Sequence, residues 1–107
     1  MGDDMLDIDI DSKKGILFVR SFGKLTKETR SKLNKEVITL INKVGIQNIV
    51  LNIQNLNYID ESGIKTLEKC YETCEKSFIC INTNQLDLIG NLKYVTDEMT
   101  AVNLIGL

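Results

Sequence analysis

The residues of this 107-residue chain that could do chemistry are three cysteines and the segment Asp60-Glu61-Ser62-Gly63. The chain contains no histidine, which excludes Ser-His-Asp and Cys-His nucleophile chemistry and removes the commonest zinc ligand. Asp60 and Glu61 are neighbours in the chain, so they do not face each other across a site as an acid–base pair would. A phosphate-binding loop of the form G-x-x-x-x-G-K-[ST] is also missing from the sequence. A small enzyme or nucleotide-binding protein is therefore the weakest hypothesis, and we predict a non-enzymatic protein without a cofactor.

The cysteines Cys70, Cys74 and Cys80 are expected to be reduced and free of metal. The first 11 residues carry five aspartates and no basic residue, unlike a secretory signal, so we expect a cytoplasmic location. An odd number of cysteines in such a chain favours free thiols. Cys70 and Cys74 are four residues apart and would share one helix face, where a soft metal could bind. Packing as small hydrophobic residues is the favoured alternative.

Composition predicts one globular domain over residues 1–107. The chain is 43% hydrophobic and 26% charged with a net charge of −2, which is typical of folded soluble domains. No apolar run of about 20 residues is present, so membrane insertion is not expected. An isoelectric point of about 5.1 argues against direct nucleic-acid binding. We expect a monomer.

Hydrophobic periodicity predicts a hairpin and a helix ahead of the acidic segment. Residues 5–10 alternate apolar and polar side chains as a half-buried strand does, and 15–22 form its partner across a turn at 11–15. Gly23 is expected to end the second strand. A helix with Thr26 as N-cap and Gly45 at its end follows. Its apolar stripe consists of Leu33, Val37, Leu40, Ile41 and Val44.

The middle of the chain predicts parallel strands joined by a helix. The apolar run at 49–53 is typical of a strand covered on both faces, and residues 55–61 are expected to form a polar loop. A second helix at about 62–76 and a buried strand at 78–81 follow. Strand, helix and strand at these lengths indicate βαβ units with right-handed crossovers.

The last quarter of the chain predicts short elements. Residues 86–89 suggest a short helix ended by Gly90, and 93–95 suggest an edge strand. Residues 97–105 fit a helix that is capped by Thr96 and ended by Gly106, although 100–105 also alternate as a strand would. The helix is favoured because its cap and stop signals agree.

The middle of the chain resembles the STAS domain, a family best known from bacterial anti-sigma factor antagonists. In that family an apolar strand and a short loop precede D-S-[ST]-G-[LI], which opens a helix. The matching residues are Ile49-Val50-Leu51-Asn52-Ile53, Leu56, Tyr58, Ile59 and Asp60-Glu61-Ser62-Gly63-Ile64, with Gly23-Lys24-Leu25-Thr26 where the family often has G-E-L-D. The resemblance implies an α/β fold: a single STAS-like domain with a mixed, mostly parallel sheet of 4–5 strands and 3–4 helices packed on it.

The resemblance also implies a function. Such antagonists bind an anti-sigma factor, typically a serine kinase with an ATP pocket, and phosphorylation of the Ser after the motif Asp abolishes capture. Glu61 occupies that position here, with a charge of about −1 in place of the −1.5 to −2 of phosphoserine. The usual phosphorylation switch is therefore not expected there. Either the protein is locked in a phospho-like state, or its partner accepts a carboxylate.

The predicted partner-binding motif consists of Tyr58, Asp60, Glu61, Ser62, Gly63 and Ile64. Ser62 is expected to be the helix N-cap, with phosphorylation of its hydroxyl as the alternative, and Asp60 could cap as well. Alternation predicts that either Tyr58 or Ile59 points outward beside Glu61. Gly63 is expected to be a turn glycine or to allow a partner to approach closely.

Two further interpretations concern partners. A STAS accessory subunit docked on a cytoplasmic transport ATPase is the alternative to an anti-sigma factor antagonist, and the acidic Glu61 makes it more credible. Lys24, Lys27 and Arg30 recur at a spacing of three. They could pair with an acidic partner, but a solvated helix face is the favoured reading.

Overall fold

The computed structural model describes residues 5–106. Strands β1 (Leu6–Lys13) and β2 (Ile16–Leu25) pair antiparallel as the predicted hairpin. Its turn is the pair Lys14-Gly15 rather than residues 11–15, and both have positive φ, 53° and 78°. Positive φ at both positions is the mark of a type I′ turn, which matches the twist of the two strands. The turn is shorter than predicted because the pairing continues to Lys13 opposite Ile16.

The remaining elements alternate between helix and strand. They are α1 (Arg30–Val44), β3 (Asn48–Ile59), α2 (Glu61–Thr73), β4 (Lys76–Cys80), the 3₁₀ helix η1 (Thr83–Leu88), β5 (Tyr94–Val95) and α3 (Glu98–Ile105). The described strands form one sheet in the order β1-β2-β3-β4-β5, and every neighbouring pair after β1 and β2 is parallel. The predicted mixed, mostly parallel sheet is confirmed, and so is helix rather than strand at 97–105.

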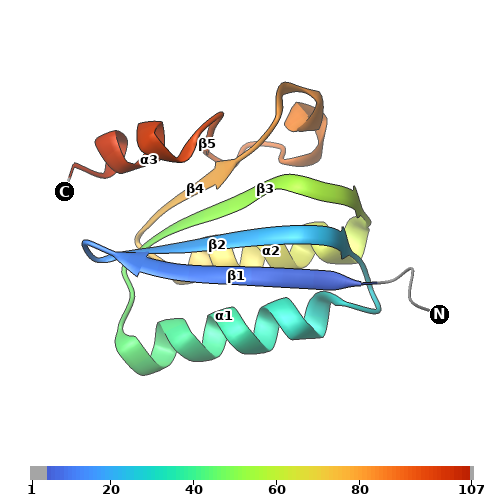
Figure 1. The fold of residues 1–107 in the computed structure, drawn as a ribbon, viewed down its shortest axis with the longest axis horizontal. Helices are drawn as coiled ribbons and strands as arrows, with labels where there is room; N and C mark the ends of the chain where they lie inside the picture. The colour runs from blue at the N-terminus through green and yellow to red at the C-terminus, as the bar shows by residue number, and fades with distance from the viewer. Residues whose placement is uncertain (1–4, 107) are drawn as a thin grey trace.

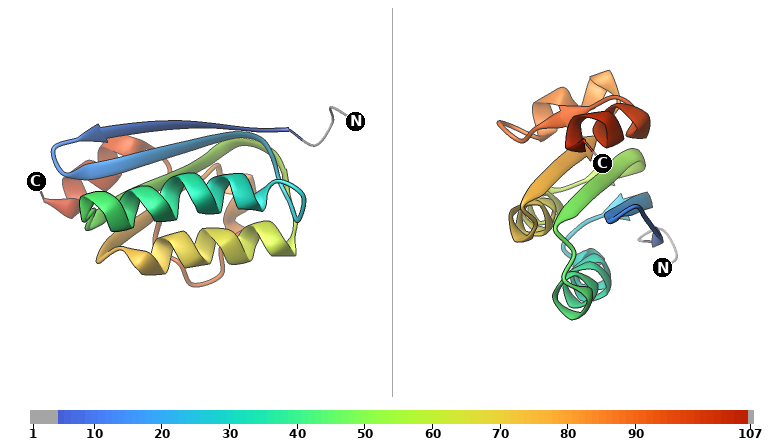
Figure 2. Two further views of the ribbon diagram at one scale, coloured as in Figure 1. Left: turned by 90° about the horizontal axis from the view of Figure 1, so that it is seen from below. Right: turned by 90° about the vertical axis from the view of Figure 1, so that its left-hand side faces the viewer.

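Helices cover the two faces of the sheet unequally (Figures 1 and 2). Helices α1 and α2 lie side by side on one face and bury the larger apolar core, to which β2, β3 and β4 contribute. On the other face, α3 closes a smaller apolar cluster over the β2–β5 region. That cluster consists of Ile16, Phe18, Val50, Cys80, Val95, Ala101 and Ile105. On this second face, none of the described helices covers β1 (Figure 1).

Strands β2 and β3 are longer than the sequence predicted. Gly23 does not end β2 but lies within it at a φ of 99°, where a side chain would collide with the carbonyl of Met5. Residues 55–59, predicted as loop, continue β3 and pair with Phe22–Leu25. The two strands extend together because each provides the other's hydrogen-bond partners, with two register irregularities along the way.

The first and last helices begin at other residues than predicted. Thr26 is not the N-cap of α1, because its carbonyl accepts the N–H groups of Thr29 and Arg30 in a turn that precedes the helix. The Thr29 hydroxyl closes this turn by accepting the N–H of Thr26 and donating to the Lys24 carbonyl. Asp97, rather than Thr96, caps α3 through the N–H of Thr100.

Candidate functional site

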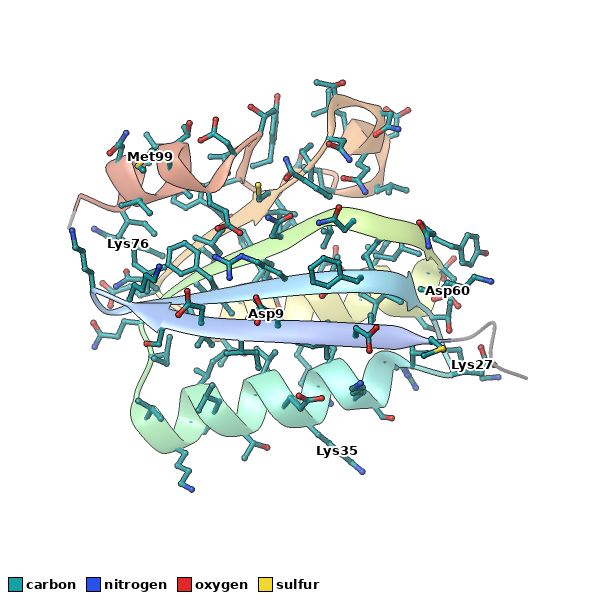
Figure 3. The ribbon with its side chains drawn as sticks, viewed as in Figure 1. Asp9, Lys27, Lys35, Asp60, Lys76 and Met99 are labelled. Atoms are coloured by element: carbon teal, nitrogen blue, oxygen red, sulfur yellow. The ribbon has the colours of Figure 1, made fainter. Side chains whose placement is uncertain are left out.

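Asp60 joins the start of α2 to the connection between β2 and α1. Its Oδ1 accepts the backbone N–H of Gly63 at 2.8 Å, which makes Asp60 the N-cap of α2. Its Oδ2 accepts the backbone N–H of Lys27 at 3.0 Å, in the connection between β2 and α1. Lys27 and Asp60 accordingly lie at the same end of the molecule (Figure 3). One carboxylate thus fixes the start of α2 against the end of β2.

These hydrogen bonds set the charge of Asp60. The N–H of Gly63, and after it that of Lys27, lowers the pKa of the Asp60 carboxyl below its ordinary value. The N-terminal end of a helix also favours a negative charge at this position. Asp60 is therefore ionised at neutral pH.

Ser62 is not the cap that the sequence predicted, because the carboxylate two residues earlier occupies that role. The backbone of Asp60 is extended, with φ −100° and ψ −178°, so the helix begins at Glu61 and Ser62 lies within its first turn. The half-buried Ser62 donates no side-chain hydrogen bond to any residue in 5–106, and its carbonyl accepts the Thr66 hydroxyl. Its hydroxyl is thus left without a structural role among the described residues.

Gly63 is needed for packing inside the protein. It is neither a turn glycine nor a point of close approach for a partner, the two roles that the sequence suggested. It is buried, and a Cβ at this position would collide with the Leu25 carbonyl oxygen and lie 2.9 Å from Cγ1 of Ile59. The N–H of Asp60 also donates to the Leu25 carbonyl at 3.2 Å. The absence of a side chain at Gly63 lets α2 start directly against the end of β2.

Two side chains of the motif project from this framework. The side chain of Glu61 is 90% exposed, and its nearest cation is Nζ of Lys65 at 3.8 Å. Tyr58 is 56% exposed, whereas Ile59 is half-buried and packs against the larger core. The prediction that one of these two neighbours points outward is confirmed, with Tyr58 as the outward residue. Ile64 is half-buried in the first turn of α2.

A groove next to Tyr58 was not predicted from the sequence. It has a volume of about 350 Å³ and lies between the end of β3 and η1. Its polar lining is composed of the amide side chains Gln54, Asn57, Asn82, Asn84 and Gln85, with Leu56, Tyr58, Ile59 and Leu88. The sequence signal for this groove was the series of amide residues in 54–57 and 82–85. It was missed because residues 55–61 were expected to form a loop.

The three basic residues Lys24, Lys27 and Arg30 do not share a helix face, because only Arg30 lies in α1. Lys27 contributes its backbone N–H to Asp60, and its side chain is exposed. Arg30 is exposed and lines a groove between α1 and α2, while Lys24 is half-buried on β2 opposite Tyr58.

The cysteines lie away from the motif and in the interior. Cys70, Cys74 and Cys80 are buried free thiols. Burial raises the pKa of Cys70 to about 12 and that of Cys80 to about 11, and it also raises the pKa of Cys74. Within residues 5–106, no three His, Cys, Asp or Glu side chains gather closely enough to hold a metal ion.

The fold and the Asp60-capped helix start define the class of protein as a STAS-like α/β domain. The model of the STAS domain family matches residues 7–81, and the chain belongs to this family. This confirms the resemblance found in the sequence. An anti-sigma F factor antagonist of Paenibacillus polymyxa is 30% identical over 59 residues. That match covers 55% of this chain and 50% of the relative, so the chain spans about half of the relative's length.

Solved structures of anti-sigma factor antagonists share the fold. One from Mycobacterium paratuberculosis has a TM-score of 0.83 at 13% identity, over 95% of each chain. The anti-sigma factor antagonist SpoIIAA in its unphosphorylated form has a TM-score of 0.76 at 14% identity, over 94% of this chain and all of the other. SpoIIAA of Bacillus in its phosphorylated form has a TM-score of 0.66 at 15% identity, over 92% of this chain and 99% of the other. At these identities the likeness concerns the fold.

None of the helices within residues 5–106 combines the length and the apolar character that crossing a bilayer requires.

Proposed function

We propose that this protein is a non-catalytic regulatory module that captures an anti-sigma factor through a surface formed by Tyr58, Asp60, Glu61 and Ser62. The observation that carries the proposal is the pair of hydrogen bonds that the Asp60 carboxylate accepts from the backbone N–H groups of Lys27 and Gly63, which fixes the base of this surface. A prearranged surface loses little conformational entropy on binding. Membership of the STAS family and the anti-sigma factor antagonist among the relatives support the choice of partner.

Glu61 supplies a permanent negative charge to this surface. Its carboxylate is almost fully exposed, and an exposed pair with Lys65 at 3.8 Å neutralises it only weakly. A partner that binds this face must therefore offer a cation or a hydrogen-bond donor to Glu61, since an unpaired charge in an interface is costly. We propose that the partner is adapted to the carboxylate.

Ser62 is the proposed site of regulation by phosphorylation. Its hydroxyl forms no hydrogen bond with the described residues, and it lies in the first turn of α2, where negative charge is favoured. Transfer of the γ-phosphoryl group of ATP to Oγ would release ADP and a proton. The resulting phosphoserine would add a second charge beside Glu61, which a partner adapted to one charge would reject.

Titration calorimetry against an anti-sigma factor of the source organism tests the role of Glu61. Glu61→Ala and Glu61→Ser should both weaken binding by about 1–3 kcal/mol, the usual loss for a hydrogen bond to a charged group. Tighter binding of both variants would mean that the carboxylate acts as a phospho-like block. Binding within about 0.5 kcal/mol of wild type, the range of an inert surface change, would place Glu61 outside the interface.

Incubation with the same partner and ATP, followed by mass spectrometry, tests Ser62. Phosphate should be found on the wild type and be lost in Ser62→Ala, whereas Ser31→Ala, which removes an exposed hydroxyl of α1, should keep it.

Affinity capture from the source cell tests the identity of the partner. Recovery of a transport ATPase in place of an anti-sigma factor would replace the proposed function with that of an accessory subunit.

A further inference from the structure

A second groove lies between α1 and α2, on the helical face of the molecule. It has a volume of about 400 Å³ and is lined by Arg30, Ser31 and Asn34 from α1 and by Lys65, Thr66 and Lys69 from α2. The two helices run side by side over this face of the sheet (Figure 2). None of the residues that line the groove beside Tyr58 contributes to this one.

The lining of this groove is positively charged. Arg30, Lys65 and Lys69 are exposed cations, and no carboxylate is among the lining residues. Lys65 has Glu61 at 3.8 Å, and within residues 5–106 neither Arg30 nor Lys69 forms an ion pair. A chain with a net charge of −2 thus keeps three cations together in one concave site. Such a site attracts anionic ligands.

The three cations are spread over the groove. Arg30 lies on α1, and Lys65 and Lys69 lie one turn apart on α2. Several separate carboxylates of one polypeptide can pair with cations arranged in this way.

We propose that the groove between α1 and α2 binds an acidic polypeptide segment. Carboxylates of the segment pair with Arg30, Lys65 and Lys69. Charge complementarity selects its acidic side chains, and the spread of the cations over two helices favours a chain with several carboxylates over a single phosphate. This binding surface is additional to the one proposed for the anti-sigma factor, and it requires neither Tyr58 nor phosphorylation.

Fluorescence anisotropy with a fluorescein-labelled oligoglutamate peptide and the full chain tests the proposal. Binding should be saturable and should weaken as salt is raised, because salt screens exposed charges. Lys69→Glu should weaken it by about tenfold or more, since it turns an attraction into a repulsion. Arg30→Glu, which introduces the same repulsion from α1, should weaken it by about tenfold or more as well.

Lys35→Glu is the matched control. It changes the net charge by the same amount and lies on α1 as Arg30 does, but Lys35 is exposed and does not line the groove. Its effect should stay within about twofold, as expected for a charge outside the binding site. An equal loss in Lys35→Glu and Lys69→Glu would overturn the proposal in favour of unspecific attraction. Absence of oligoglutamate binding, or inorganic tripolyphosphate binding more tightly than oligoglutamate and weakened by Lys69→Glu, would overturn it as well.

Discussion

A bidentate salt bridge joins Arg20 on β2 to Glu98 in the first turn of α3, which lies 78 residues later in the sequence. Nε and Nη2 of Arg20 donate to the two carboxylate oxygens of Glu98, each at 2.8 Å. Nδ2 of Asn52 on β3 donates to the same carboxylate at 2.8 Å. The bridge holds α3 over the sheet face opposite α1 and α2, at the margin of the smaller core.

Replacing Glu98 should destabilise the protein. Glu98→Ala removes the acceptor for Arg20 and Asn52, and we expect a loss of about 1–3 kcal/mol in the free energy of unfolding, as for hydrogen bonds to charged groups. Urea denaturation measures it. Glu72→Ala, at an exposed position of α2, is the control and should change the free energy by less than about 0.5 kcal/mol. Equal effects of the two variants would show that the bridge contributes nothing.

The same bridge predicts a dependence of stability on pH. Hydrogen bonding to Arg20 is the main cause that lowers the pKa of Glu98 in the folded protein. The stabilisation is therefore complete above the unfolded-state pKa of Glu98, about 4.3, and is lost as the pH falls toward the lower folded-state pKa. Between neutral pH and about pH 3 the stability of the wild type should fall more steeply than that of Glu98→Gln. Parallel curves from urea denaturation would contradict this.

Gly63→Ala is expected to reverse the usual effect of this substitution. Alanine in place of glycine within a helix ordinarily stabilises by about 0.5–1 kcal/mol. Here the new methyl group would collide with the Leu25 carbonyl, so we expect a destabilisation of about 1–3 kcal/mol, as for other overpacked sites. Thermal denaturation followed by circular dichroism decides the sign. An increase in Tm would mean that α2 and β2 do not approach each other as described.

The thiols should react slowly in the folded protein. Cys70, Cys74 and Cys80 are buried, and the pKa of each is raised by burial, so the reactive thiolate is scarce at pH 8. Modification by Ellman's reagent should be slow in buffer and fast in denaturant, with three thiols counted at the end. Rapid modification of any one of them in the native state would show that its surroundings are open.

Much of the fold followed from the sequence, and the errors in strand length share one cause. Local periodicity was enough for the hairpin, α1 and the helix at 97–105, because each carries its own apolar pattern. It failed for residues 55–59, where Asn55 and Asn57 suggested a loop but pairing with β2 continues the strand. Strand length is decided by a partner far away in the sequence, which local patterns do not contain.

The site was predicted less completely than the fold. Asp60 and Ser62 are both good N-cap residues, and only the extended backbone of Asp60 decides between them. The packing of Gly63 against Leu25 and the hydrogen bond from the Lys27 N–H to Asp60 join segments more than 30 residues apart. Such contacts depend on the assembled sheet, so the sequence indicated which residues matter without indicating what they touch.

The most direct test of the proposed interface is the affinity of Tyr58→Ala for an anti-sigma factor of the source organism, with Tyr94→Ala as the matched control. Both tyrosines are about half exposed, at 56% and 48%, but Tyr94 lies on the edge strand β5, away from the motif. Exposed tyrosines at the centre of an interface often contribute about 2 kcal/mol or more to binding.

Titration calorimetry should therefore show a loss of at least about tenfold in affinity for Tyr58→Ala, and little change for Tyr94→Ala. Unchanged binding by Tyr58→Ala, or an equal loss in both variants, would contradict the interface proposed at the start of α2.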